Sequence, residues 1–265
     1  MSKNTEGQLN DSVLVALSGG VDSTLTAALL QRAGYDCHGV TMHLFGDLTA
    51  GTADAAAVAQ NVGIDFAALD FSDAFRREVM ARFVREYEAG RTPNPCLYCN
   101  RALKFGALLS YAAAHGWDRM ATGHYARLVF RLSSPVLCRA VDKTKDQSYF
   151  LYRVKPEILE RTIFPLGELT KDEVRAKARA FGLEVAEKGD SQDFCGGDPM
   201  RIVNEPDREG EVVTVDGKII GRHRGYWNYT VGMRKGLGIG GGTPYYVVAL
   251  DAKQNRVIVG FKDDA

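Results

Sequence analysis

The sequence lacks an excess of charge of either sign, a long apolar run and a large set of cysteines. Lysine plus arginine number 33, as do aspartate plus glutamate, so no net field draws the chain to nucleic acid or a membrane. Charged or polar residues interrupt every apolar run, which excludes a transmembrane helix. The polar N-terminus has no signal-peptide core, so we expect a cytoplasmic protein. Five cysteines, an odd number, favour thiol chemistry or metal binding over a disulfide framework.

Strand-like and helix-like segments alternate through the first part of the chain. Strands are predicted over 11–17, 37–44, 66–69 and 119–123, and helices over 24–33, 53–62, 71–89, 103–115 and, in two pieces, 158–182. This alternation predicts an α/β fold with a doubly wound parallel sheet. Beyond residue 211 the chain is rich in valine, tyrosine and glycine, which favours short antiparallel strands. We therefore expect a nucleotide-binding domain over 1–200 and a small β-rich domain over 201–265.

A phosphate-binding loop is predicted directly after the first strand, where the sequence reads Ser-Gly-Gly-Val-Asp-Ser over 18–23. Two glycines let the backbone bring several N–H groups to an anion, and the following helix N-terminus adds partial positive charge. Asp22 is placed either to hold Mg²⁺ or to orient the loop. The string is not a Walker loop, because no Gly-Lys-Ser/Thr follows. It matches the PP-loop of enzymes that cleave ATP between the α and β phosphates.

Two cysteines lie at the predicted start of a helix. Asn94 is a suitable N-cap and Pro95 a suitable first residue, which places Cys96 and Cys99 on one face of the first turn. A helix N-terminus lowers the pKa of a thiol, so we expect a reactive thiolate or a metal ligand here. Cys195 follows a polar loop that gives no reason to bury it. Two further cysteines, Cys37 and Cys138, lie in apolar strand-like segments and are interpreted as structural.

Taken together, these motifs resemble the tRNA-uridine 2-sulfurtransferases, the bacterial enzymes that thiolate the wobble uridine of tRNA. The ordered matches are SGGVDS at 18–23, TPNPCLYCNRALKF at 92–105, ATGHYAR at 121–127, KDQSYFL at 145–151, FPLGELTKDEVR at 164–175, KGDSQDFC at 188–195 and YTVGMRKGLGIGGGTPYYVV at 229–248. The resemblance covers roughly residues 11–260. Such a series of motifs in order is far more specific than any single one.

The resemblance implies a role for each matched position. Contacts with ATP are implied for Ala16, Leu17, Ser18, Gly19, Gly20, Val21, Asp22, Ser23, Met42 and Gly123. Cys99 matches the nucleophile, Cys195 the cysteine that holds persulfide sulfur, and Lys145, Asp146 and Gln147 a segment that contacts RNA. ATP, with Mg²⁺, would adenylate the C2 oxygen of uridine, and sulfur from a donor protein or sulfide would then displace AMP.

Cys96 stands where many members of this family have an aspartate. Cys96, Cys99 and Cys195 then make three candidate thiolate ligands, the set that holds a 4Fe–4S cluster in other tRNA thiolases. A cluster and a persulfide relay between Cys99 and Cys195 are both compatible with the sequence, and the cluster is the interpretation we favour. A zinc site remains an alternative, although structural zinc usually has a fourth ligand.

Met233 replaces a glutamine that is usual in the family, with no effect that we can assign.

The sequence constrains the RNA substrate less than it constrains the sulfur-transfer chemistry. Typical family members continue into a further β-barrel that grips the tRNA, so this chain resembles a short form. A sulfurtransferase for a free base or another small molecule, and a non-catalytic subunit of a modification complex, are the alternatives. Residues 217–250 contain five lysines and arginines, interleaved tyrosines and a tryptophan, and no acidic residue. We predict an RNA-facing patch there, the alternative being that the aromatics form a domain core.

Overall fold

The structure is a computed structural model that describes residues 11–46, 48–132, 134–189, 207–240 and 242–264. Its contacts divide the chain into two compact units, each built from two segments. The first unit comprises residues 1–76 and 96–192, and the second comprises 77–95 and 193–265. The division near residue 200 that we expected from the sequence places 77–95 in the N-terminal domain, whereas these contacts group it with the C-terminal residues.

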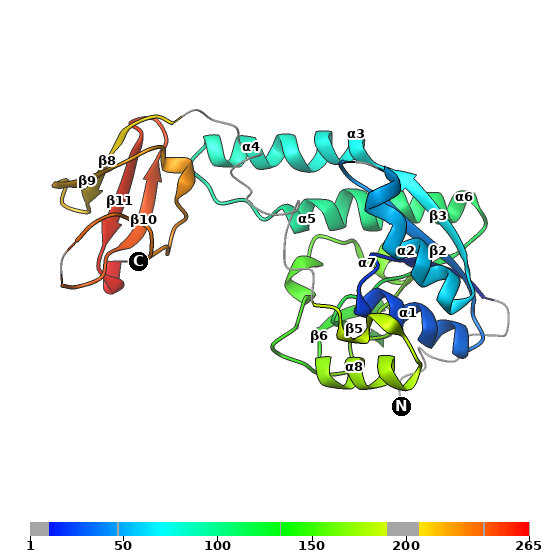
Figure 1. The fold of residues 1–265 in the computed structure, drawn as a ribbon. Helices are drawn as coiled ribbons and strands as arrows, with labels where there is room; N and C mark the ends of the chain where they lie inside the picture. The colour runs from blue at the N-terminus through cyan, green and yellow to red at the C-terminus, as the bar shows by residue number, and fades with distance from the viewer. Residues whose placement is uncertain (1–10, 47, 133, 190–206, 241, 265) are drawn as a thin grey trace. The chain divides into compact units, whose positions relative to one another are not determined.

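A five-stranded parallel sheet forms the centre of the first unit (Figure 1). Its strands are β1 (Ser12–Ala16), β2 (Asp36–His43), β3 (Asp65–Asp70), β4 (Arg119–Ala121) and β7 (Thr162–Ile163), in the order β3-β2-β1-β4-β7. The chain builds outward from β1 to β3 and then returns to place β4 on the other side of β1. Ligands bind at such a switch point, outside the carboxyl ends of the strands. The doubly wound α/β fold is therefore confirmed.

Helices cover both faces of this sheet. They are α1 (Val21–Arg32), α2 (Leu48–Val62), α3 (Ser72–Phe75), α5 (Pro95–Cys99), α6 (Leu109–Ala114), α7 (Pro156–Leu159) and α8 (Lys171–Ala180). A π-helical segment, Asn100–Leu108, joins α5 to α6, so residues 95–114 form one helical run. Short 3₁₀ turns follow at Ser148–Phe150 and Glu184–Glu187. Helix α1 begins at Val21, three residues earlier than predicted, so Asp22 and Ser23 belong to its first turn.

Strand β1 separates two apolar cores, one on each face of the sheet. Val13 and Val15 pack with residues of α1 and α2, whereas Leu14 packs with Phe105 and Leu108 of the helical run 95–114. This alternation follows from the period of two along a strand. Both faces are buried, as a parallel sheet between helices requires. The carboxyl end of β1 is thereby held rigidly where the predicted phosphate loop begins.

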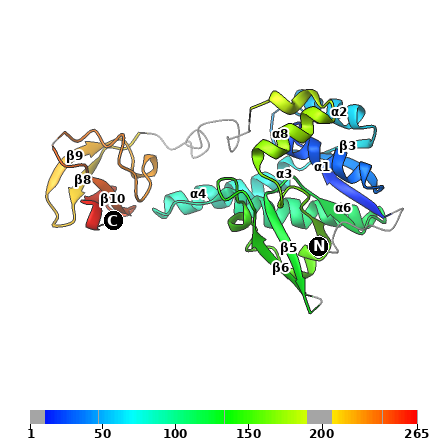
Figure 2. The ribbon, with the colours of Figure 1, turned by 90° about the horizontal axis from the view of Figure 1, so that it is seen from below.

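A two-stranded antiparallel hairpin, which the sequence did not reveal, extends from the first unit (Figure 2). Its strands are β5 (Ala126–Arg131) and β6 (Ser134–Arg139). Valine, phenylalanine and leucine side chains stay exposed on it; Leu132 is 102% exposed. The hairpin connects the region after β4 with the predicted RNA-contact segment at 145–147.

The second unit contains a four-stranded sheet and a helix from far upstream. The strands are β8 (Gly210–Thr214), β9 (Ile219–His223), β10 (Tyr246–Asp251) and β11 (Arg256–Gly260), in the order β10-β11-β8-β9. The β11–β8 pair is parallel and the others are antiparallel. The helix is α4 (Ala81–Glu88), which follows a π-helical turn at Arg76–Met80. It contributes Phe83 and Tyr87 to the core of this sheet.

The RNA-facing patch predicted over 217–250 is wrong for its central residues. Tyr226 and Trp227 are buried in the core of the second unit, with Tyr229 and Tyr245 packed against it. Arg222 pairs with Glu209 and Arg224 with Asp207. Those acidic partners lie just upstream of the acid-free stretch, so a linear charge count could not find them. The alternative, that these aromatics form a domain core, is the one the structure supports.

Across the described ranges, no helix combines the length and the apolarity needed to cross a membrane.

Candidate active site

A cavity of about 410 Å³ opens at the carboxyl ends of β1 and β4. Such a volume lies within the range of small-molecule sites, about 300–1,000 Å³. Its lining comprises Ala16, Leu17, Ser18, Gly20, Val21, Asp22, Ser23, Val40, Met42, Lys104, Thr122, Gly123, His124, Tyr125, Lys145, Gln147, Lys171 and Gly189. Every residue predicted to contact ATP lines this cavity except Gly19. The switch point of the sheet and the phosphate loop therefore coincide.

Hydrogen bonds inside the loop fix its backbone. The Ser18 N–H donates to the Ser23 hydroxyl over 3.1 Å, and the Ser23 and Thr24 hydroxyls donate to the Gly20 carbonyl over 3.1 and 2.8 Å. Lys188 donates to the Gly19 carbonyl over 3.3 Å and pairs with Asp54. The first N–H groups of a helix lack intrahelical acceptors. The start of α1 thus offers these donors in a fixed arrangement that suits a phosphate.

Two glycines are required by this geometry. Gly19 adopts a φ of +72°, in the left-handed region that glycine tolerates. Gly123, at the end of β4, approaches the start of α1 so closely that a Cβ there would lie 3.0 Å from backbone atoms of both Asp22 and Ser23. Gly123 thereby allows β4 and the phosphate loop to lie against one another.

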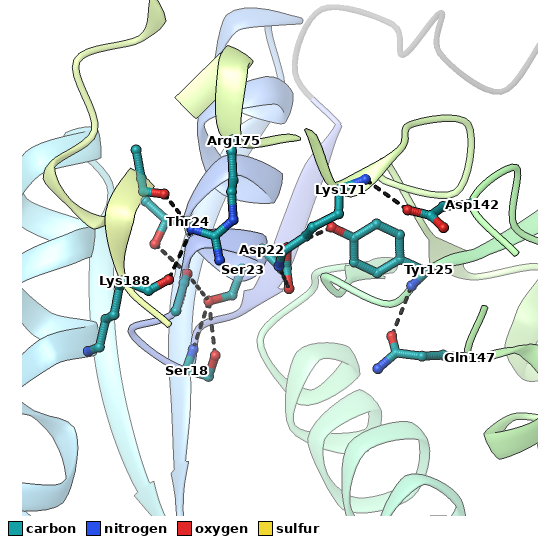
Figure 3. Close-up of polar contacts among 12 residues, drawn as sticks. Ser18, Asp22, Ser23, Thr24, Tyr125, Asp142, Gln147, Lys171, Arg175 and Lys188 are labelled. Atoms are coloured by element: carbon teal, nitrogen blue, oxygen red, sulfur yellow. Dashed lines mark hydrogen bonds and ion pairs between the residues drawn. The ribbon is translucent and has the colours of Figure 1, made fainter. Parts of the chain in front are cut away.

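Asp22 is held by two groups from distant parts of the chain (Figure 3). The Nζ atom of Lys171 lies 2.7 and 2.8 Å from its two carboxylate oxygens, and the Tyr125 hydroxyl donates to one of them over 2.8 Å. Both oxygens of Asp22 are therefore engaged. Of the two roles considered for Asp22, this arrangement favours orientation of the loop over direct coordination of Mg²⁺.

The same cluster reaches the segment predicted to contact RNA. The Tyr125 N–H donates to the Gln147 side chain over 3.0 Å, and the Gln147 N–H donates to the Tyr125 carbonyl over 2.8 Å. Lys145 and Gln147 line the cavity, whereas Asp146 is absent from its lining. Asp146 instead accepts bonds from the Ala140 N–H and the Ser148 hydroxyl, at 3.0 and 2.9 Å. The three predicted residues thus divide into two that face the cavity and one that shapes the loop.

The cavity is electropositive. Lys104, Lys145 and Lys171 contribute ammonium groups, and Asp22 is the only acidic residue in the described lining. Burial, together with the nearby Lys104 ammonium, holds the pKa of His124 well below its usual range, so its ring is neutral at pH 7. The His124 Nδ1 atom lies 2.7 Å from the Thr122 hydroxyl. This charge balance suits a polyanion such as a triphosphate.

Cys96 and Cys99 lie at the start of the helical run 95–114, which begins at Pro95 as predicted. Cys99 is buried and Cys96 half-buried. Burial raises the pKa of both thiols, and the Lys104 ammonium opposes that shift only in part. Burial thus shifts the pKa of both thiols in the direction opposite to the lowering that we expected from a helix N-terminus.

The π-helical segment brings Lys104 towards Cys99. In an α-helix, residues five apart point about 140° away from each other. A π-helix closes its hydrogen bonds between residues i and i+5, which brings such residues towards one face. Lys104 follows Cys99 by five positions, lines the cavity and interacts electrostatically with Cys96, Cys99 and His124. One lysine thus connects the nucleotide cavity with the thiol pair.

The third candidate ligand, Cys195, lies outside the described residues. Among the residues described, no three histidine, cysteine or acidic side chains converge as a metal site would require. Cys37 is buried in β2, where burial and then Asp36 raise the pKa of its thiol to about 11. Cys138 lies in β6 of the hairpin. Neither cysteine lines the cavity, and their structural role stays a prediction.

Sequence reasoning missed Lys104, Tyr125 and Lys171. Lys171 carried a signal, because it is the first residue of α8, where the helix dipole favours an acidic residue over a lysine. Thr170 and Glu173 form a capping box that fixes this helix start. The sequence thus specified where α8 begins, but not that its first side chain reaches Asp22, 149 residues away.

Two protein-family models match the chain in sequence. The tRNA methyl transferase HUP domain covers residues 11–196, and the tRNA methyl transferase PRC-barrel domain covers residues 202–261. Among solved structures, an NMN synthetase from Francisella tularensis is 17% identical with a TM-score of 0.43, over 73% of this chain and 75% of that chain.

Relatives of known name are much more similar. A tRNA-specific 2-thiouridylase MnmA from Acidithiobacillus ferrooxidans is 49% identical over 263 residues, which cover 95% of this chain and 75% of that protein. The protein of the same name from Syntrophotalea carbinolica is 47% identical over 268 residues, covering 96% and 76%. With matches of this extent added to the phosphate loop and the thiol pair, the chain belongs to the tRNA-specific 2-thiouridylase (MnmA) family.

Proposed function

We propose that this protein is an ATP-dependent tRNA-uridine 2-sulfurtransferase, which replaces the C2 oxygen of a uridine with sulfur. The observation that supports this most strongly is the position of Lys104. It lines the phosphate-loop cavity and lies beside Cys96 and Cys99. A site for ATP and a pair of thiols are thus adjacent within one unit, as the two halves of such a reaction require. The tRNA substrate also favours a cytoplasmic site of action.

Activation is the first half of the reaction. The uridine C2 oxygen attacks the α-phosphorus of ATP, the bond to the β-phosphate oxygen breaks, and pyrophosphate leaves. Donors at the start of α1 and the ammonium groups of Lys104 and Lys145 would stabilise the charge that develops on the phosphates. The cavity residues predicted to contact ATP are assigned to this step. Asp22, held by Lys171 and Tyr125, keeps the first turn of α1 in place.

Sulfur transfer is the second half. A sulfur nucleophile attacks C2, and the C2–O bond breaks with AMP as the leaving group. Adenylation has thus turned the carbonyl oxygen, a poor leaving group, into a good one. We assign Cys195 as the residue that accepts sulfane sulfur from the persulfide of a donor protein. The Cys99 thiolate then attacks this persulfide and releases hydrosulfide, the nucleophile for C2, and the Cys99–Cys195 disulfide that remains is reduced by an external thiol. Sulfide as the donor would attack C2 without forming a persulfide. Because burial raises the pKa of the Cys99 thiol, its deprotonation needs a base or a change in its surroundings once RNA binds.

Two metal groups are compatible with these residues. A 4Fe–4S cluster would be held by Cys96, Cys99 and Cys195, and the i, i+3 spacing of the first two suits paired thiolate ligands. Such a cluster would supply an open iron able to bind sulfide. Mg²⁺ would be held by the ATP phosphates and water, since both oxygens of Asp22 already accept from Lys171.

Thiolation of a tRNA transcript tests this function. The protein, purified without oxygen, is incubated with ATP, Mg²⁺, transcript, a reducing thiol and a persulfide-bearing donor protein, with sulfide replacing the donor in a parallel reaction, and pyrophosphate and 2-thiouridine are quantified. We expect both products in equal amounts. Cys99→Ser should abolish 2-thiouridine in the reaction with the donor protein, whereas Cys138→Ser, a change of the same type on the hairpin, should not. Iron and acid-labile sulfide are measured on the same preparation. Full activity of an iron-free protein would exclude the cluster and support the persulfide relay.

Other outcomes of this assay would support one of the alternative functions. Pyrophosphate release with uracil or uridine, but not with RNA, would support the small-molecule alternative. No pyrophosphate release under any condition would support a non-catalytic subunit. The family models bear the name of a methyl transferase, so a parallel reaction with S-adenosylmethionine is included. Methyl transfer to the transcript without thiolation would overturn the proposed function.

A further inference from the structure

An exposed aromatic surface lies beside the thiol pair, and neither the fold nor the ATP site requires it. Its members are Tyr98, Tyr149, Tyr152 and Arg153, which we call the aromatic platform. Tyr149 and Tyr152 are 57% and 62% exposed. Tyrosine combines a large apolar ring with a polar hydroxyl, and for that reason it is enriched at binding interfaces.

The platform is held together and held to the cysteine helix. The Arg153 guanidinium lies 6.0 Å from the ring centre of Tyr98 and 5.7 Å from that of Tyr152, and it donates to the Tyr152 hydroxyl over 3.1 Å. Tyr98 stands between Cys96 and Cys99 in sequence. The Asn100 side chain donates to the Phe150 carbonyl over 3.2 Å, which ties the segment 148–153 to the same helical run.

Burial of the intervening residues explains why the aromatic side chains face outward. Leu151 is 0% and Val154 6% exposed, and both belong to the core under the sheet. They anchor the segment, so Tyr149, Tyr152 and Arg153 are presented to solvent. The Tyr149 ring lies 3.9 Å from that of Phe150. The bond from Asn100, one residue beyond Cys99, to Phe150 and the contact of Arg153 with Tyr98 place the platform next to the helical turn that carries the thiols.

The positive charge around the aromatic platform favours a partner that carries both negative charge and nucleic-acid bases. Residues 143–155 contain Lys143, Lys145, Arg153 and Lys155 and a single acidic residue, Asp146. Asp146 is directed inward, since it accepts from Ala140 and Ser148. Basic side chains beside exposed aromatic rings are the combination that binds single-stranded RNA, in which bases stack on tyrosine rings and on arginine planes.

We infer that the aromatic platform stacks unpaired RNA bases adjacent to the acceptor uridine and so positions that uridine at Cys99. This inference rests on the proposed function, and it adds to it the residues that hold the bases next to the acceptor. A base must leave its stack before an enzyme can act on it, and the platform offers its neighbours replacement stacking partners. Tyr149 directly precedes Phe150, whose carbonyl accepts from Asn100 next to Cys99, so it is the platform residue that we assign to the nucleotide nearest the acceptor.

Binding of two RNAs to matched variants tests the inference. A hairpin with an unpaired seven-nucleotide loop and a fully paired duplex of equal length are titrated against wild type, Tyr149→Ala, Tyr152→Ala and Tyr149→Phe. One lost stacking contact should weaken hairpin binding by about 5- to 100-fold. Tyr149→Phe should restore it to within about twofold, because the ring is retained. Phe130→Ala, on the exposed hairpin, is the control and should bind like wild type.

Three further readouts separate stacking from a structural defect. Hairpin affinity of Tyr149→Ala should decrease by the same factor at each salt concentration, since no phosphate contact is lost. A 2-aminopurine beside the acceptor uridine should be quenched by wild type and not by Tyr149→Ala. ATP affinity without RNA should be unchanged. Unaltered hairpin binding by Tyr149→Ala, or an equal loss for the duplex, would overturn the inference alone, whereas wild type that binds neither RNA would overturn the proposed function with it.

Discussion

The Nζ atom of Lys171 lies 2.7 and 2.8 Å from the two carboxylate oxygens of Asp22, and this ion pair connects the first turn of α8 with the first turn of α1. The Lys171 side chain is 10% exposed and that of Asp22 31%. The Lys171 backbone N–H also donates to Asp142 over 3.0 Å, at the start of the segment that leads to Lys145. One lysine thus orders both the phosphate loop and the predicted RNA-contact segment.

Replacement of this lysine should damage both stability and ATP binding. Lys171→Met leaves a partly buried carboxylate without its charged donor, and we expect a loss of about 1–3 kcal/mol in the free energy of unfolding. Urea denaturation and ATP titration would measure the two effects. Lys177→Met changes an exposed lysine of the same helix and should alter neither. Wild-type stability and ATP affinity in Lys171→Met would contradict a role for the pair.

Loss of the Tyr125 hydroxyl isolates the second contact of Asp22. Tyr125→Phe keeps the buried ring and the backbone bonds to Gln147 but removes the 2.8 Å bond to the carboxylate. A hydrogen bond to a charged group contributes about 1.5–3 kcal/mol, so we expect kcat/KM for ATP to fall by about tenfold or more, measured as pyrophosphate release.

The control for Tyr125→Phe is Tyr35→Phe, because Tyr35 is a buried tyrosine of the same unit outside the cavity lining. If the two variants lose activity equally, the effect of Tyr125→Phe belongs to general packing and not to Asp22.

Alkaline pH should destabilise the protein through Cys37. Burial raises the pKa of this thiol from 9.0 to about 11. The unfolded chain therefore loses the proton as pH rises past 9, whereas the folded chain keeps it until about 11. Stability is full below pH 9 and falls between these values, by about 3 kcal/mol in total. Urea denaturation from pH 8 to 11 would show this slope, and Cys37→Ala should reduce it. An unchanged slope would assign the loss to other groups.

The core of the second unit should depend on α4. Phe83 is 2% exposed and packs in one cluster with Trp227, Val257 and Val259. Phe83→Ala should cost this unit about 3–5 kcal/mol. Trp227 fluorescence in a Trp117→Phe background reports on this unit alone, because the chain has two tryptophans. Arg82→Ala, a change on the same helix at a residue outside the cluster, is the control. Equal midpoints for the two variants would contradict the packing.

Local patterns predicted the parts of the site that are local in sequence. The loop 18–23, the strand before it and the helix after it were found because backbone conformation, glycine placement and phosphate chemistry act within a few residues. Lys104 was not recognised, since its position depends on a π-helical segment that no composition signal announces. Tyr125 and Lys171 were missed because their contacts with Asp22 span 103 and 149 residues.

The same reasoning explains the incorrect interpretations. The aromatic residues of 217–250 and their arginines were read without their partners, Phe83 and Tyr87 on α4 and the acidic residues Asp207 and Glu209. The thiol pKa was predicted from the helix dipole alone, whereas burial depends on the packing of the whole unit. Both errors arise where tertiary neighbours decide the outcome.

The second unit is encoded by two stretches, 77–95 and 193–265, with most of the catalytic unit between them. A protein engineer who transplants residues 201–265 as a cassette would therefore leave Phe83 and Tyr87 behind and expose an apolar face. A functional exchange between relatives must therefore move both stretches, with splice junctions at 76/77, 95/96 and 192/193. A single crossover between residues 95 and 193 would separate the two sides of this core, so the two stretches are expected to be inherited together.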